Sequence, residues 1–169
     1  RAGVAALLET HPGVSMLPHA ATVELLKHYG FQCADYRLAS TYDEAGYAAR
    51  MLGFPVILKG MVANVVHRSD AGLVSRKISN EAELQQEFAA LAGTVLKTTN
   101  GSTTVSVEKY FPHDFEVILG VKYDATFGPV ILCGLGGIFT EILKDYALRL
   151  APLSDDDARD MLSSLKAFP

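Results

Sequence analysis

The sequence has few cysteines, no long apolar run and no excess of basic residues. Its two cysteines, Cys33 and Cys133, lie far apart and match no metal-binding spacing, so we expect two buried, reduced thiols. No segment is apolar for long enough to cross a membrane, and no signal peptide is visible. The net charge of −4 argues against a general nucleic-acid or membrane-surface binder, although a local positive site for an anionic ligand is compatible with it. These absences predict a cytoplasmic protein with neither nucleic acid nor membrane as a partner.

What the sequence does contain is an ordinary globular composition. Of its 169 residues, 49% are hydrophobic and 20% are charged, which is enough for one or two small domains with a core. No internal repeat or low-complexity tract is present. The chain begins at Arg1 rather than Met and stops at Pro169, so we interpret it as a piece of a longer protein.

Apolar periodicity and capping residues predict alternating helices and strands. Helices are expected at 18–29, at 41–53, from Asn80 with the core face Leu84, Phe88, Leu91 and Val95, and after a Ser154 cap. Strands are expected at 32–38, 55–60, 73–78, 104–110, 115–123 and 129–133. Residues 1–17 have the loose pattern of a linker tail with at most one short helix. The order predicts a mixed α+β fold with two lobes, 18–103 and 104–169, whose boundary lies within 98–112.

The most informative stretch is 127–153, where an apolar strand runs into glycines and then into two acids. Glycines let backbone N–H groups approach an anion closely, and carboxylates just beyond are the hard oxygen ligands that hold Mg²⁺. The glycines match neither the P-loop nor the complete dinucleotide fingerprint, so their coupling to the acids is what indicates a nucleotide site. The acids, four residues apart, could instead lie on a solvated helix face. The residues selected by this pattern are Gly134, Gly136, Gly137, Glu141, Asp145 and Arg149.

Other polar residues could also carry chemistry, each with a plainer alternative. Lys59 ends an apolar strand, where it could contact a phosphate or reach solvent from a sheet edge. In the loop His67–Gly72 (HRSDAG), the histidine could accept a phosphoryl group while Asp70 orients its ring, or the loop could be a capped turn. The strand end Glu108–Phe111 could meet an adenine edge or be an ordinary strand end. Glu116 alternates with apolar neighbours and faces either a cleft or solvent.

With these residues, the sequence resembles the ATP-grasp portion, of the β-subunit type, of the nucleoside-diphosphate-forming acyl-CoA synthetases. These are acetate–CoA ligases that make ADP, and they are related to succinyl-CoA synthetase. The resemblance covers about Leu17 to the C-terminus. It rests on ELLKHYGF at 24–31, GFPVILKG at 53–60, HRSDAG at 67–72 and the long block at 116–153.

The resemblance implies a two-lobed ATP-grasp fold that holds MgATP or MgADP in a cleft between the lobes. Lys59 would contact the phosphates, the residues from Glu108 to Phe111 would line the adenine and ribose pocket, and Glu116 would lie on the ribose or metal side. The implied nucleotide-binding residues are Lys59, Glu108, Lys109, Tyr110, Phe111, Glu116, Gly134, Gly136, Gly137 and Arg149, and the implied Mg²⁺ ligands are Glu141 and Asp145.

The implied reaction is acyl-CoA + ADP + phosphate ⇌ carboxylate + CoA + ATP. Phosphate would pass through His67, with Arg68 steadying the transferred charge and Asp70 beside it. The CoA-binding and CoA-ligase domains are not found in this chain and would be its partners in an oligomeric parent. The sequence departs from the family pattern at Leu73, where a second glycine is usual, and at Arg68, where lysine is common. We expect Leu73 to reduce the mobility of the loop.

An alternative function is that of a ligand-sensing, synthetase-like regulatory domain of a protein lysine acetyltransferase. Leu73 mildly favours this hypothesis, whereas the intact His67, Lys59, Glu141 and Asp145 favour the enzyme. A different ATP-grasp ligase, such as a carboxylase, would not explain the HRSDAG loop beside the glycine block.

Overall fold

The chain folds into two compact units that meet in sequence between Phe111 and Pro112. A computed structural model describes residues 2–14, 16–63, 65, 68–99, 101–137 and 144–166. The division lies within the expected boundary region 98–112, but after residue 103, because strand β3 (Val105–Lys109) is the central strand of the first unit's sheet. A strand paired on both sides within one sheet stays with that sheet.

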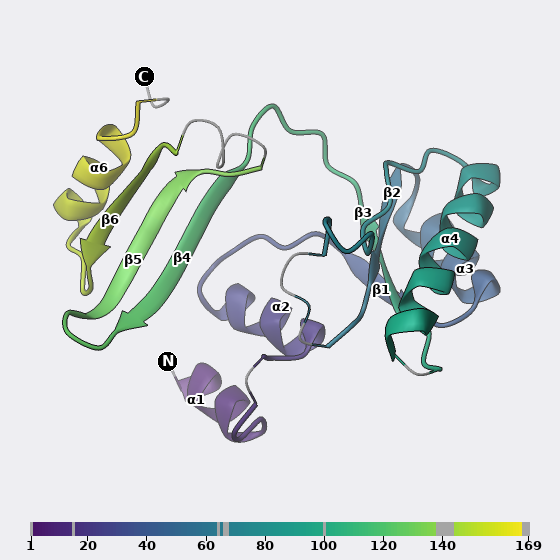
Figure 1. Cartoon of the computed structure of the whole chain (residues 1–169), viewed down its shortest axis with the longest axis horizontal. Coiled ribbons are helices and arrows are strands. Elements are labelled where there is room, and N and C mark those ends of the chain that lie inside the picture. The colour runs from purple at the N-terminus through teal and green to yellow at the C-terminus, as the bar shows by residue number, and fades with distance from the viewer. Residues whose placement is uncertain are drawn as a thin grey trace. The chain divides into compact units, whose positions relative to one another are not determined.

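The first unit is an antiparallel sheet with helices. Its elements are α1 (Ala2–Glu9), α2 (His19–His28), β1 (Tyr36–Ala39), α3 (Tyr42–Leu52), β2 (Val56–Gly60), α4 (Glu81–Thr99) and β3. The strand order is β1-β3-β2, and both pairings are antiparallel. Helices α3 and α4 lie against one face of this sheet, and α2 lies on the other side (Figure 1).

The core of the first unit lies between its sheet and the helices α3 and α4. Leu58 and Val107 are paired across β2 and β3 and are fully buried. The predicted core face of α4 is confirmed, since Leu84, Phe88, Leu91 and Val95 are all buried. Together these apolar contacts pack one face of the sheet against the helices and fix the strands that carry the side chains of the opposite face.

Local capping determines where α3 begins, as the sequence predicts. The Thr41 side chain accepts a hydrogen bond from the Glu44 N–H at 3.3 Å, and the Glu44 carboxylate accepts one from the Thr41 N–H. Gly53 follows the helix with φ of 73°, a conformation that glycine adopts without steric cost. The helix end therefore leads directly into β2.

Residues 73–78 do not form the strand expected from their pattern. They make two isolated bridges to β2, Val74 with Lys59 and Ile78 with Val56. Leu73 and Ile78 are buried, so this segment joins the core through its side chains rather than through a continuous ladder. The apolar pattern therefore marked a buried segment whose backbone bonds to β2 at isolated positions instead of forming a regular strand.

The second unit is a smaller antiparallel sheet with a helix on it. Its described elements are β4 (Val117–Asp124), β5 (Gly128–Leu135), β6 (Tyr146–Leu150) and α6 (Asp155–Ser163), with the strand order β4-β5-β6. Strand β6 was not predicted from the sequence. Helix α6 contacts β5 and β6 and buries Cys133, Ala147, Met161 and Leu165.

Both cysteines are free thiols, but only Cys133 is buried as expected, whereas Cys33 is partly exposed. None of the helices in the described part of the chain combines the length and hydropathy that a membrane crossing requires.

Candidate functional site

The front face of the first sheet, opposite α3 and α4, carries polar side chains at its centre. Side chains alternate along β3, so Ser106 and Glu108 share a face, while Val105 and Val107 point into the core. Residues paired across an antiparallel ladder also share a face. Ser106 is paired with Lys59, so the lysine of β2 lies on this same front face.

Lys59 and Glu108 form an ion pair on this face. Their Nζ and Oε2 atoms are 2.7 Å apart, and Glu108 is only 5% exposed although it is an acid. A carboxylate at this depth needs a cationic partner, because desolvation of an unpaired charge is costly. Lys59 therefore does not simply extend into solvent from a sheet edge.

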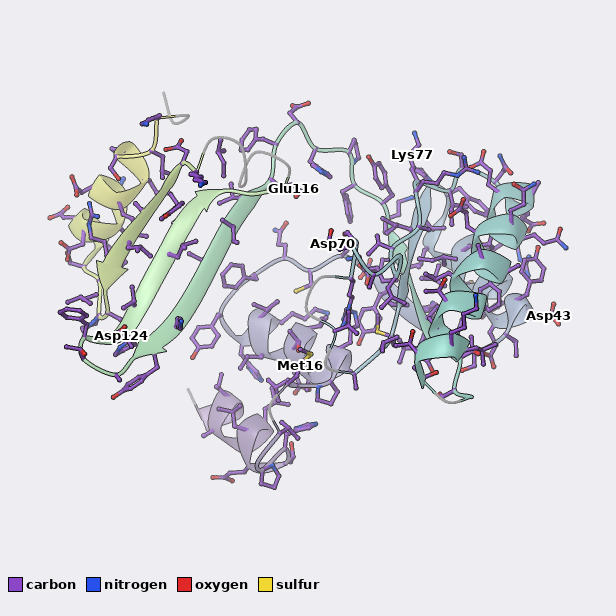
Figure 2. The ribbon with its side chains drawn as sticks, in the orientation of Figure 1. Met16, Asp43, Asp70, Lys77, Glu116 and Asp124 are labelled. Carbon is purple, nitrogen blue, oxygen red and sulfur yellow. The ribbon has the colours of Figure 1, made fainter. Side chains whose placement is uncertain are left out.

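A pocket of about 560 Å³ is lined in part by Lys59, the cation of this ion pair. Its walls come from the segment before α2, the first turn of α2, the end of β2 and the turn at 68–70. Figure 2 shows Met16 just before α2 and Asp70 on the segment between β2 and α4. Two cations and one acid from the predicted site meet here. The polar lining residues are His19, Thr22, Lys59, Arg68, Ser69 and Asp70.

The turn that carries Arg68 and Asp70 is closed by its own backbone. The Leu73 N–H donates to the Arg68 carbonyl at 2.8 Å, and the Gly72 N–H donates to the Ser69 carbonyl at 3.0 Å. Gly72 has φ of 66°, so the pair of bonds is a Schellman closure with glycine in the left-handed position. Leu73, only 1% exposed, anchors the turn in the core. The unusual leucine thus holds Arg68 and Asp70 at the pocket.

His19, the first residue of α2, was not predicted from the sequence as a site residue. Its Nε2 atom lies 3.7 Å from Glu108 Oε1, and its ring packs edge-on against Tyr36 with centroids 4.5 Å apart. Burial lowers the pKa of His19, Arg68 and Lys59 lower that pKa further, and Glu108 opposes them. A single histidine after a proline carries no sequence signal, so only the packing of α2 on the sheet reveals it.

The predicted adenine-binding residues of the first unit have other partners in the structure. The Lys109 ammonium donates to the carbonyls of Gly53 and Phe54 at 2.7 and 3.2 Å, on the side of the sheet away from Glu108. The backbone N–H of Lys109 donates to Asp35, and that of Tyr110 donates to Pro55. The Tyr110 ring lies 5.9 Å from the Lys77 ammonium, and Phe111 is 58% exposed. The structure therefore does not bring Lys109 to the pocket.

In the second unit, Glu116 lies beside the glycine turn that follows β5. Its carbonyl accepts a hydrogen bond from the Gly136 N–H at 2.8 Å, and its Oε1 lies 3.1 Å from His113 Nε2. Gly137 has φ of 60°, a left-handed backbone conformation that other residues rarely adopt, so glycine is favoured there beside the Glu116 carboxylate. Figure 2 shows Glu116 where the chain enters β4, with Asp124 at the far end of the strand. The structure thus brings Glu116, Gly136 and Gly137 together.

Three other predicted residues of the second unit have structural partners. A Cβ atom on Gly134 would lie 2.5 Å from the Asp145 carbonyl, so this glycine permits the close approach of β5 and the start of β6. Asp145 is buried, and its carboxylate accepts a hydrogen bond from the Lys166 N–H at 3.0 Å. The Arg149 guanidinium lies 2.8 Å from the Asp160 carboxylate of α6.

His67 and Glu141 lie outside the described residues, so their predicted roles rest on the sequence. Asp145 is not on a helix but directly precedes β6, so it does not share a described helix face with Glu141. Within the described ranges, no three His, Cys, Asp or Glu side chains are gathered as a metal site.

Comparison with known proteins identifies the family of the chain. The model of a family described as the ATP-grasp domain matches residues 10–169, and the chain belongs to that family. It is 36% identical over 148 residues to the β subunit of acetate–CoA ligase [ADP-forming] I of Pyrococcus furiosus. That match covers 86% of this chain and 64% of the relative, so the chain spans less than two thirds of that protein's length.

Solved structures confirm the ATP-grasp fold. The chain is 31% identical to acetyl-coenzyme A synthetase 1 of Ca. Korarchaeum cryptofilum in complex with coenzyme A, Ca-AMPCP and HgCl⁺, with a TM-score of 0.85. This match covers 99% of the chain and 74% of the other chain. A second structure of that enzyme contains coenzyme A and Mg-AMPPCP, with a phosphohistidine segment pointing towards the nucleotide-binding site. It matches with a TM-score of 0.72 and 31% identity, covering 99% of this chain and 71% of the other.

Proposed function

We propose that this chain is the ATP-grasp module of an ADP-forming acyl-CoA synthetase of the acetate–CoA ligase type. It binds MgATP or MgADP and transfers phosphate through His67 to or from a CoA-ligase domain. The observation that carries this proposal is the pocket where Lys59, paired to a buried acid, meets Arg68 and Asp70. Family membership and the names of the relatives support the same function.

The pocket has the charges that a nucleotide polyphosphate requires. Lys59 and Arg68 supply two cations from separate segments, and a phosphate between them exchanges contacts with water for charge-assisted hydrogen bonds. Arg68 also neutralises charge on a phosphoryl group in transfer, because its guanidinium stays protonated. Asp70, on the same closed turn, is available to orient the His67 imidazole.

The phosphoryl step is a balanced exchange between two nucleophiles. In the direction of ATP formation, the P–N bond of phosphohistidine at His67 breaks while a terminal oxygen of ADP forms the new P–O bond. The imidazole is regenerated as the leaving group and can accept the next phosphoryl group. Histidine suits this role since its phosphoramidate passes phosphate in either direction.

Magnesium binding is proposed for Glu141 and Asp145, with Glu116 and the glycines Gly136 and Gly137 on the nucleotide side. Carboxylate oxygens are the ligands that Mg²⁺ prefers, and the ion would neutralise phosphate charge. For Asp145, this role must coexist with its hydrogen bond from Lys166 or replace it. Gly134 and Arg149 are also proposed for the nucleotide, although each has a structural partner here.

The partners of the module are proposed to be CoA-binding and CoA-ligase domains, in the same parent or in a second subunit. The similar proteins are named as ligase and synthetase, and they give no support to the regulatory acetyltransferase alternative.

The test is ATP formation from ADP, phosphate and acetyl-CoA by the parent protein that carries this chain. We expect His67→Ala to abolish ATP formation, because the phosphoryl carrier is lost, while His28→Ala on the exposed side of α2 leaves it unchanged. Both variants should keep the wild-type circular dichroism spectrum. A His67→Ala protein that makes ATP at the wild-type rate would overturn the proposed function.

A further inference from the structure

The polar centre of the front face contains buried atoms whose hydrogen bonds are incomplete. Glu108 Oε1, Ser106 Oγ and His19 Nε2 are all inaccessible to solvent and have no hydrogen-bond partner among the described residues. Buried polar atoms of this kind carry a desolvation cost unless something satisfies them. The three atoms lie where α2 meets the sheet, next to the pocket proposed for phosphate.

Glu108 has one strong partner, and ligand binding would compete for it. Lys59 Nζ contacts Oε2 at 2.7 Å and also lines the pocket. If a polyphosphate draws Lys59 away, Glu108 becomes a buried carboxylate without a cation. An uncompensated buried charge of this kind strongly destabilises a protein. The titratable side chain that already lies against the other oxygen is His19, at 3.7 Å.

We propose that His19 is a positioning residue, which takes up a proton from solvent when a nucleotide polyphosphate binds and replaces Lys59 as the partner of Glu108. This inference rests on the proposed function, because the anion in the pocket is the nucleotide. The proton balance is simple. One solvent proton is bound by the neutral imidazole, and the resulting imidazolium donates a hydrogen bond to Glu108 Oε1 while Lys59 contacts the phosphate.

The charges around His19 support the direction of this coupling. Among the described residues, the groups that face it are Glu108 on β3, Lys59 on β2, the Tyr36 ring on β1 and Arg68 on the closed turn. In the structure, burial lowers the pKa of His19, and the two cations lower it further, so the imidazole is neutral near pH 7. A bound polyanion would neutralise Lys59 and Arg68 and raise this pKa. Affinity should therefore increase as pH falls from the bound-state pKa towards the free-state pKa, and then level off.

The first test needs no nucleotide. The pKa of each histidine in the full chain is measured by NMR titration, in the wild type and in Lys59→Gln. Removal of Lys59 takes away a cation that lowers the pKa of His19 and leaves His19 beside Glu108, so the pKa of His19 should rise. His28, which is exposed on the same helix, serves as the internal control and should not change. An unchanged pKa of His19 would overturn the coupling, whatever the chain binds.

The second test measures proton uptake on MgADP binding. Titration calorimetry in two buffers of different ionisation enthalpy gives the number of protons bound, at most about one for a single imidazole. The wild type and His28→Gln should take up the same number, whereas His19→Gln should lose it, and its affinity should become nearly independent of pH. Equal uptake in His19→Gln and wild type would contradict the inference while leaving nucleotide binding intact. If the wild type binds no MgADP, the proposed function fails for this chain, and the NMR titration alone decides the role of His19.

Discussion

The sheet of the first unit is covered on both faces, by α3 and α4 behind and by the start of α2 in front. In the second unit, among the described residues, a single helix covers part of one face. Both sheets are three-stranded and antiparallel, yet the central strand β3 buries four of its five residues, whereas the central strand β5 buries two of eight. The edge strand β4 exposes Val117, Leu119, Val121 and Tyr123. Apolar area removed from water is the main stabilising term, so the first unit should be much the more stable of the two.

The two units also differ in the role of their polar residues. In the first unit, Lys59 and Glu108 are held on a strand whose opposite face is core, so their positions are defined by packing. In the second unit, Asp145 and Arg149 tie β6 to the helix region that covers it. A phosphate-transfer site needs rigid support. Small displacements of its charged groups reduce the stabilisation of the transition state more than they reduce the stability of the fold.

The largest expected effect is loss of core packing in the first unit. Leu84→Ala removes a fully buried side chain and should lower the free energy of unfolding of that unit by about 2–5 kcal/mol. Val121→Ala, at a side chain 71% exposed on β4, should change the stability of the second unit by less than about 0.5 kcal/mol. Urea denaturation with probes in each unit measures both. Comparable losses at the two positions would show that the exposed strand is packed in solution.

A smaller effect is expected at the close approach between β5 and β6. Gly134→Ala places a methyl group 2.5 Å from the Asp145 carbonyl, and overpacking of this kind should destabilise the second unit by about 1–3 kcal/mol. Gly120→Ala on β4 is the matched control, since a Cβ there meets nothing within 4 Å. Thermal unfolding of the two variants gives the comparison. If both melt like the wild type, the two strands are not held this closely.

The smallest effects should come from the two capping boxes, one in each unit. Thr41 caps α3 and Ser154 caps α6, and loss of either hydroxyl should cost about 1 kcal/mol. Among the described residues, α6 is the helix that packs on the second sheet, whereas α3 shares the first sheet with α4. Ser154→Ala should therefore lower the melting temperature of the second unit by more than Thr41→Ala lowers that of the first. Hydrogen exchange of β5 and β3 amides reports each unit separately. A larger effect of Thr41→Ala than of Ser154→Ala would contradict the inference that the second sheet depends more on its single covering helix.

Features with local causes were predictable from the sequence. The α3 capping box depends on residues three apart, and the buried face of α4 follows from apolar spacing of three and four residues. Both sets of contacts form within a single helix and its immediate cover. The ATP-grasp family was recognised from motifs, because the residues of a motif are adjacent in sequence whatever the fold around them.

The tertiary structure decided the features that join distant segments. Strand β6 was missed because its pairing partner lies on β5, and the spacing of Glu141 and Asp145 also allowed a shared helix face. Lys59 and Glu108 are separated by 49 positions in the chain and meet only because β2 and β3 pair, while Lys109 turns to the opposite face by simple alternation. His19 became part of the site only when α2 packed on the sheet. Pairing and packing between remote residues depend on the free energy of the whole unit, which no local pattern contains.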